Sequence, residues 1–145
     1  MTPGSKTRRL SWKELLAKGE LVLLPSAHDG LTAKLIEQAG FSAFQVGGFS
    51  VVGARSGFPD VDLAQFGEMS QTVREVLAAS RLPVMVDCND CYGDVKNVAH
   101  VVRSYETMGV SSIFIEDQVA PKRCGHMVAS RSFQWNWPRR RSPQR

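Results

Sequence analysis

The sequence predicts an α/β fold in which helices cover a parallel β-sheet. Short apolar runs of strand length alternate along the 145 residues with longer segments whose apolar residues recur at helical spacing. The apolar runs are almost continuous, which is typical of strands buried on both faces of a parallel sheet. Polar residues gather where these runs end, and parallel α/β folds place their active sites at that edge.

The first predicted elements are a short helix at residues 11–19 and a strand at residues 21–25. Ser11, followed three residues later by Glu14, has the pattern of a capping box. The apolar run at 21–25 has the length of a strand. A loop then leads to a second helix, which Asp29 is placed to cap. The apolar face predicted for that helix consists of Leu31, Leu35, Ile36 and Ala39.

The middle of the chain predicts two more strands, separated by a loop and a helix. Residues 42–47 form the second predicted strand, and the glycine-containing stretch 48–61 is predicted to be a loop. Residues 82–87 are mostly apolar until the last position and predict the third strand. The helix between them has its apolar residues at helical spacing, at Phe66, Met69, Val73, Val76 and Leu77.

A further helix and a fourth strand complete the predicted β-α-β-α-β-α-β order. Asp94 is placed to cap this helix, and Gly109 is placed to end it. Residues 111–117 predict the fourth strand. The apolar residues of the helix are Val95, Val98, Val102 and Tyr105.

The net charge of +4 comes from the C-terminal end of the chain. Five arginines lie in residues 131–145, which contain no acidic residue, and without them 13 basic residues face 14 acidic ones. The body of the chain therefore does not favour a nucleic-acid partner. No run approaches the roughly 18 apolar residues of a membrane span, so no membrane partner is expected. Three cysteines without framework spacing favour a reducing, cytoplasmic location.

The stretch at residues 113–126 joins a buried strand to a loop of charged and reactive residues. It reads I-F-I-E-D-Q-V-A-P-K-R-C-G-H, and Glu116 ends its apolar run. Basic neighbours favour the reactive thiolate form of a cysteine. An acid at the end of a strand beside a loop with such a cysteine is therefore a plausible catalytic site. The basic and reactive residues of the loop are Lys122, Arg123, Cys124 and His126.

A second polar stretch, V-D-C-N-D-C-Y-G at residues 86–93, follows the third predicted strand. A carboxylate at a strand end with other oxygen ligands nearby suits Mg²⁺, which binds one or two carboxylates and keeps several waters. A strand-end cap is the alternative role for Asp87. Cys88 and Cys91 form a Cys-x-x-Cys pair, a spacing that redox and zinc proteins use. Two unrelated thiols are the alternative.

The contiguous run I-E-D-Q-V-x-x-K-R-C-G-H resembles the signature of the isocitrate lyase and phosphoenolpyruvate mutase superfamily. It is most similar to the methylisocitrate-lyase-like branch, also described as carboxyvinyl-carboxyphosphonate phosphorylmutase-like. The resemblance implies the N-terminal half, about four βα units, of a phosphoenolpyruvate-type (β/α)₈ TIM barrel. The expected parts are a helical segment at 1–20, the partial barrel at 21–128 and a basic tail at 129–145. No βα pattern continues in the tail, which is expected to be disordered or out of frame.

The resemblance also implies a metal site and a substrate site at the strand ends. Asp87 matches a metal-binding aspartate of the family, and Glu116 matches the acid that holds the metal directly or through water. Asn89 stands where the family has a second aspartate, so Mg²⁺, or alternatively Mn²⁺, is expected to bind more weakly. Cys91 stands where a glycine is expected. The implied substrate-binding residues are Gly47 (a serine in the family), Gly48 and Asp60.

Cys124 implies carbon–carbon lyase chemistry, because the mutase and decarboxylase branches lack a cysteine at this position. The implied reaction is retro-aldol cleavage of a 2-hydroxy di- or tricarboxylic acid through an enolate, under a loop that carries Lys122, Arg123, Cys124 and His126. The implied partner is the small carboxylate substrate, and full-length relatives are expected to be homo-oligomers. As half of a barrel, the 145-residue chain is expected to be inactive on its own.

Two alternatives remain open. The first alternative to the lyase is a phosphonomutase or oxaloacetate-decarboxylase type of the same superfamily. The second is a non-catalytic half-barrel that binds a partner or dimerises.

Overall fold

The computed structural model of the protein describes residues 10–125, 127 and 132. Its strands are parallel and form one sheet in the order β1-β2-β3, so the predicted α/β class is confirmed. In the described part of the chain, no helix has the length and apolarity that crossing a bilayer requires. The strands are β1 (Phe44–Val46), β2 (Val84–Asp87) and β3 (Ser112–Phe114).

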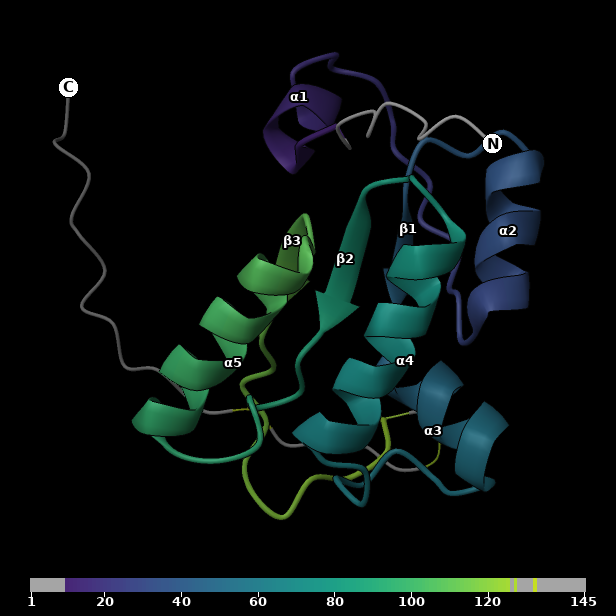
Figure 1. Cartoon of the computed structure of the whole chain (residues 1–145). Coiled ribbons are helices and arrows are strands. Elements are labelled where there is room, and N and C mark those ends of the chain that lie inside the picture. The colour runs from purple at the N-terminus through teal and green to yellow at the C-terminus, as the bar shows by residue number, and fades with distance from the viewer. Residues whose placement is uncertain (1–9, 126, 128–131, 133–145) are drawn as a thin grey trace, which may run out of the picture.

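Helices α2, α4 and α5 lie side by side along one face of the sheet, with α4 in contact with both of its neighbours (Figure 1). Helix α3 follows β1 directly and lies at the end of the sheet where the strands stop (Figure 1). The helices are α1 (Trp12–Leu16), α2 (Gly30–Gln38), α3 (Gly48–Ser56), α4 (Phe66–Ala79) and α5 (Val95–Met108).

Short-range hydrogen bonds begin and end the helices as predicted. Ser11 and Glu14 form the capping box of α1, and Asp29 accepts the Thr32 N–H at the start of α2. Asp94 accepts backbone N–H groups at the start of α5. Gly109 ends α5 in the left-handed conformation, at a φ of 88°. These caps fix where each helix begins and ends relative to the sheet.

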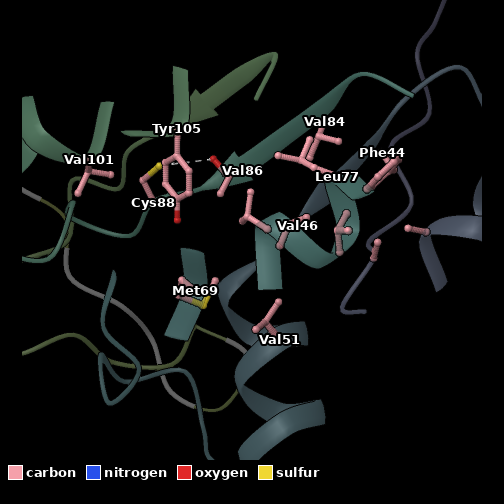
Figure 2. Packing of buried hydrophobic residues seen from close by; sticks show 14 of the residues in the cluster. Phe44, Val46, Val51, Met69, Leu77, Val84, Val86, Cys88, Val101 and Tyr105 are labelled. Carbon is pink, nitrogen blue, oxygen red and sulfur yellow. Dashed lines mark hydrogen bonds between the residues drawn. The ribbon is translucent and has the colours of Figure 1, made fainter. Parts of the chain in front are cut away.

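The core lies between the sheet and the helices (Figure 2). Alternate strand residues point into it, including the register partners Phe44 and Val84, which are fully buried. Gln45 and Met85, which are also partners, point to the opposite face and are only half-buried. The expectation of strands buried on both faces is therefore wrong for the described residues, because helices cover one face only.

Helix α3 occupies the first part, residues 48–56, of the loop predicted at residues 48–61. Val51 and Val52 are 2% and 4% exposed, so the helix forms by packing an apolar patch despite its glycines. Gly57 ends it with a φ of 66°, as a left-handed C-cap. Tertiary burial outweighs local propensity here.

The strand predicted at residues 21–25 is reduced to a single parallel bridge between Ser26 and Gln45. The Gln45 N–H donates to the Pro25 carbonyl at 3.0 Å, and the Ala27 N–H donates to the Gln45 carbonyl at 2.8 Å. Leu21 is 87% exposed, because no described segment covers this side of the sheet. The segment therefore runs beside β1 without forming a ladder.

Two helix faces differ from prediction. In α2 the prediction for Ile36 is confirmed, but Leu31 and Leu35 are exposed and Ala33 is the other buried residue. In α5 the buried residues are Val101 and Tyr105, whereas Val95 and Val102 are exposed. The expected tail at 129–145 lies outside the described residues except for Ser132, which bridges to Gln118.

Candidate active site

Three strands end at the same edge of the sheet and bring their polar residues together there. Gly48 follows β1, Asp87 ends β2 and Glu116 lies two residues after β3. The Gly48 N–H donates to Asp87 Oδ2 at 3.3 Å, which ties the start of α3 to the end of β2. The parallel topology therefore assembles residues that lie far apart in the sequence.

The turn after β2 aims Asn89 at this edge. The Asn89 N–H donates to Asp87 Oδ1 at 2.9 Å, and the Asn89 backbone is left-handed with a φ of 48°. Cys91 is also left-handed, with a φ of 66°, a conformation that favours glycine. The expectation that this position needs glycine's freedom is thus consistent with the backbone that the turn adopts.

The side chain of Lys122 reaches from the loop after β3 into the centre of the site. Its Nζ lies 2.6 Å from Asn89 Oδ1 and 3.0 Å from Asp60 Oδ1. It also lies 3.3 Å from Glu116 Oε2, and the Lys122 side chain is only 4% exposed. Three other predicted site residues therefore meet at the ammonium group of Lys122.

Local hydrogen bonds hold the Lys122 loop against the strand ends. The Glu116 N–H donates to the Asn89 carbonyl at 2.7 Å. Gln118 Nε2 donates to Glu116 Oε2 at 2.8 Å, and the Arg123 N–H donates to Gln118 Oε1 at 3.4 Å. The segment that follows β3 consequently folds back across the end of the sheet (Figure 1).

Burial and charge act in opposite directions on the ionisable groups of the site. Burial raises the pKa of Asp87, and hydrogen bonds from the Asn89 and Gly48 N–H groups only partly offset it. Burial alone would lower the pKa of Lys122, but the hydrogen bond and charge of Asp60 and the other carboxylates outweigh it and raise that pKa. The ammonium form of Lys122 is therefore stabilised by this site.

The oxygen atoms around Lys122 have the chemistry of a divalent-cation site. A Cβ at Gly48 would lie 3.1 Å from Asn89 Oδ1, 3.3 Å from Asp60 Oδ1 and 3.7 Å from Asp87 Oδ2. Three side-chain oxygens thus converge on a space that only glycine leaves open. No three His, Cys, Asp or Glu side chains group as a metal site within the described residues. Mg²⁺ needs only one or two carboxylates besides amide oxygen and water, so the donor set fits it.

Replacing Gly48 with alanine is expected to lower the free energy of unfolding by about 1–3 kcal/mol, because the methyl group must displace Asn89 and Asp60. Gly53 provides a matched control in the same helix, because a Cβ there meets nothing within 4 Å. Gly53→Ala is expected to raise the free energy of unfolding by about 0.5–1 kcal/mol, because alanine is more stable than glycine inside a helix. Urea unfolding of both variants measures the difference. Equal effects of the two substitutions would contradict the crowding at Gly48.

The predicted substrate-binding turn has two hydroxyl groups beside it. A Cβ at Gly47 would lie 3.6 Å from both Ser26 Oγ and Ser50 Oγ. These two hydroxyls are hydrogen-bonded to each other at 2.9 Å. Ser50 therefore places a hydroxyl close to the position of the serine that the family pattern expects at 47.

The predicted loop residues are not all gathered at the site. Lys122 contacts the carboxylates, whereas Cys124 is buried at 4% exposure and Arg123 is exposed. His126 lies outside the described residues. The catalytic roles of Cys124, Arg123 and His126 remain predictions.

The Cys-x-x-Cys pair does not have the features of a reactive site. Cys88 and Cys91 are both free and fully buried. Burial raises the pKa of both thiols, which disfavours the thiolate that redox and zinc chemistry requires. The structure favours two packed thiols, with Cys88 lying beside Tyr105 in the core (Figure 2).

Two site residues had no role in the sequence prediction. Gln118 links Glu116 to the Lys122 loop, and Asp62 lies in the loop after Asp60. Burial raises the pKa of Asp62, and its Oδ1 is buried without a partner in the described residues. The spacing of Asp62 two residues after Asp60 was the available signal. Both residues line a shallow pocket together with Asp90, Glu116, Ala120 and Lys122.

Comparisons with known proteins agree on one family. The sequence profile described as "Phosphoenolpyruvate phosphomutase" matches residues 12–135. The chain is similar to the isocitrate lyase of Haloferax volcanii, at 39% identity over 85% of this chain and 35% of that protein. It is also similar to the 2,3-dimethylmalate lyase of Eubacterium barkeri, at 41% identity over 80% of this chain and 40% of that protein.

Solved structures give the same result. A 2,3-dimethylmalate lyase matches with a TM-score of 0.76 and 28% identity, over 84% of this chain and 41% of that one. An oxaloacetate acetylhydrolase bound to 3,3-difluorooxalacetate matches with a TM-score of 0.73 and 31% identity, over 79% and 39%. The chain therefore spans about two fifths of the length of the relatives it matches.

Proposed function

Because the chain belongs to the phosphoenolpyruvate phosphomutase family, we propose that it carries the metal-binding part of a Mg²⁺-dependent carbon–carbon lyase. The observation that supports this most is the convergence of the Asp60, Asn89 and Glu116 oxygens on one cation, the Lys122 ammonium. Their position at the carboxyl ends of parallel strands is where α/β enzymes place their chemistry.

The proposed substrate is a 2-hydroxy di- or tricarboxylic acid. Relatives of this chain include proteins named isocitrate lyase, 2,3-dimethylmalate lyase and 2-methylisocitrate lyase. Cys124, in the run K-R-C-G-H, favours this lyase group over the mutases. The two hydroxyls beside Gly47 and the N–H groups at the start of α3 are the proposed contacts for a substrate carboxylate.

The proposed metal ligands are Asp60, Asp87, Asn89 and Glu116, held directly or through water. A bound Mg²⁺ would supply Lewis-acid polarisation of the substrate's oxygen atoms. The residues of this chain hold the ligands in place: Asp87 is fixed by two backbone N–H groups, and Glu116 is fixed by Gln118. Mn²⁺ suits the same oxygen donors.

We also propose that the described fold is part of a (β/α)₈ barrel and that the chain works in the cytoplasm. The half-buried face of the sheet, with Gln45 and Met85, would then be the interior of the barrel. Relatives are more than twice as long, so residues beyond those matched here would complete the site.

The expected result for the 145-residue chain alone is no measurable cleavage of 2-methylisocitrate, isocitrate or 2,3-dimethylmalate with Mg²⁺ present. Co-expression with the C-terminal part of the 2,3-dimethylmalate lyase of Eubacterium barkeri, beyond its matched region, is expected to restore cleavage of one acid. A coupled assay for the keto- or dicarboxylic acid product measures both. Turnover by the chain alone at an ordinary enzymatic rate of about 1–10³ s⁻¹ would contradict the need for further residues.

A non-catalytic module that dimerises is the second candidate, and one observation favours it. Leu21 and Leu23, in the segment that leads to the Ser26 bridge with β1, are 87% and 61% exposed, and exposed apolar residues near a sheet edge favour association. Size-exclusion chromatography of the same sample distinguishes the candidates. A monodisperse dimer without complementation supports the module, and restored cleavage on complementation supports the lyase.

A further inference from the structure

The charge balance of the site depends on Lys122, which is not one of the proposed metal ligands. Asp60, Asn89 and Lys122 are 8%, 2% and 8% exposed, so the groups that meet there are largely shielded from water. A buried carboxylate without a counter-charge is strongly unfavourable. Lys122 supplies that counter-charge at 3.0 Å from Asp60 and 3.3 Å from Glu116.

The ammonium group uses the same oxygen atoms that a divalent cation would use. Asp60 Oδ1 and Asn89 Oδ1 both accept hydrogen bonds from Lys122 Nζ. The same two atoms lie within 3.3 Å of the space that Gly48 leaves open. Two cations this close in a site of low polarity repel each other strongly. We therefore expect Lys122 and a metal ion to compete for these ligands.

We propose that Lys122 is a resident cation that occupies the metal position and must leave it before Mg²⁺ binds. This inference rests on the proposed metal site. It makes the loop after β3 a sensor of metal, because Lys122 is carried on the segment that Gln118 ties to Glu116. Metal binding would release the lysine, expose it to solvent and free it to meet an anionic substrate.

The substitution of an asparagine for a second acid strengthens the argument. Asn89 gives Lys122 its shortest contact, at 2.6 Å, while adding no negative charge to attract a divalent ion. A monovalent ammonium is thereby favoured over Mg²⁺ compared with a site that has an aspartate at this position. Asn89→Asp is expected to shift the balance toward the metal.

The first test measures Mn²⁺ affinity by electron paramagnetic resonance, with Mg²⁺ affinity measured by calorimetry. If Lys122 occupies the site most of the time, metal can bind only to the small fraction of molecules in which the site is vacant, and the apparent metal affinity falls by that fraction. Lys122→Met removes this competition and is therefore expected to tighten metal binding about tenfold or more. Lys34→Met removes an exposed lysine from α2 and is expected to change affinity by less than about twofold. Circular dichroism establishes that each variant is folded.

The second test uses the unaltered chain and so does not depend on any variant folding. N-hydroxysuccinimidyl acetate acetylates accessible amines, and mass spectrometry reports each lysine separately. Lys122 is buried, whereas Lys34 and Lys96 are exposed. Saturating Mg²⁺ is expected to raise acetylation of Lys122 by roughly tenfold, as the released fraction grows, and to leave the two exposed lysines unchanged.

The outcomes separate this inference from the proposed function. Tighter binding by Lys122→Met with metal-dependent exposure of Lys122 supports the resident cation. Equal affinity of the native chain and Lys122→Met would overturn it and leave the metal site standing. Absence of binding by the native chain, Lys122→Met and Asn89→Asp alike would overturn both the metal site and the inference.

Discussion

Replacing Phe44 with alanine is expected to lower the free energy of unfolding by about 3–5 kcal/mol. Phe44 is fully buried in β1, an outer strand of the described sheet, opposite Val84 of the central strand β2 (Figure 2). The substitution removes a phenyl ring from a close-packed layer that relaxes only in part, so the loss includes both transfer and cavity contributions. Domains of this size are stable by about 5–15 kcal/mol in total, so this substitution would remove a large share of the stability.

Phe58 is the matched control for this substitution. It is 52% exposed between α3 and α4, so Phe58→Ala is expected to change stability by no more than about 0.5 kcal/mol. Urea unfolding followed by circular dichroism measures both variants under one set of conditions. A loss below about 1 kcal/mol for Phe44→Ala would show that β1 is not part of a cooperative core.

Features that depend on neighbouring residues were predictable from the sequence. The caps at Ser11, Asp29 and Asp94 were correct because a cap is decided within four residues of chain. The parallel order was also correct, because apolar strands separated by long helices have few other solutions.

Features that depend on what covers a segment were not predictable. The glycines of residues 48–57 predict a loop, whereas Val51 and Val52 form part of helix α3 because they pack into the core. The strand at 21–25 was expected because it is apolar, yet Leu21 and Leu23 find no cover in the described residues. Apolar pattern reports the capacity for burial, whereas the tertiary fold decides whether burial occurs.

The candidate site shows the same division. Asp87, Asn89 and Glu116 were identifiable as polar residues at strand ends, and the structure brings the latter two onto one atom of Lys122. The family resemblance places Lys122 in a loop that faces the substrate. Its place between the carboxylates depends on the fold-back that Gln118 stabilises, a contact for which residue type alone offers no signal.

Replacing Asp87 with asparagine is expected to weaken Mg²⁺ binding by more than about 100-fold, because the variant loses the charge of a proposed ligand. Mutating residues that only support metal ligands already lowers metal affinity by about 10–100-fold. Asp94→Asn is the matched control: it removes one carboxylate at the exposed start of α5 and keeps a good cap. Calorimetry in the native chain and in a Lys122→Met background measures the change with and without the competing ammonium. Equal affinities for Asp87→Asn and Asp94→Asn would exclude Asp87 as a ligand.

The Asp87→Asn protein is expected to remain folded at neutral pH, which makes the binding result interpretable. Burial raises the pKa of Asp87 above its ordinary value of 3.8, so the folded chain binds this proton more tightly than the unfolded chain. That contribution to stability is fully present below the ordinary pKa and is lost as the pH rises through the raised pKa. At neutral pH the buried charge therefore opposes folding, and the neutral amide avoids this effect while losing one acceptor for a backbone N–H. Urea unfolding is expected to show a smaller difference in stability between the variant and the native chain at pH 7 than at pH 4. The opposite order would mean that Asp87 stabilises the fold as a carboxylate.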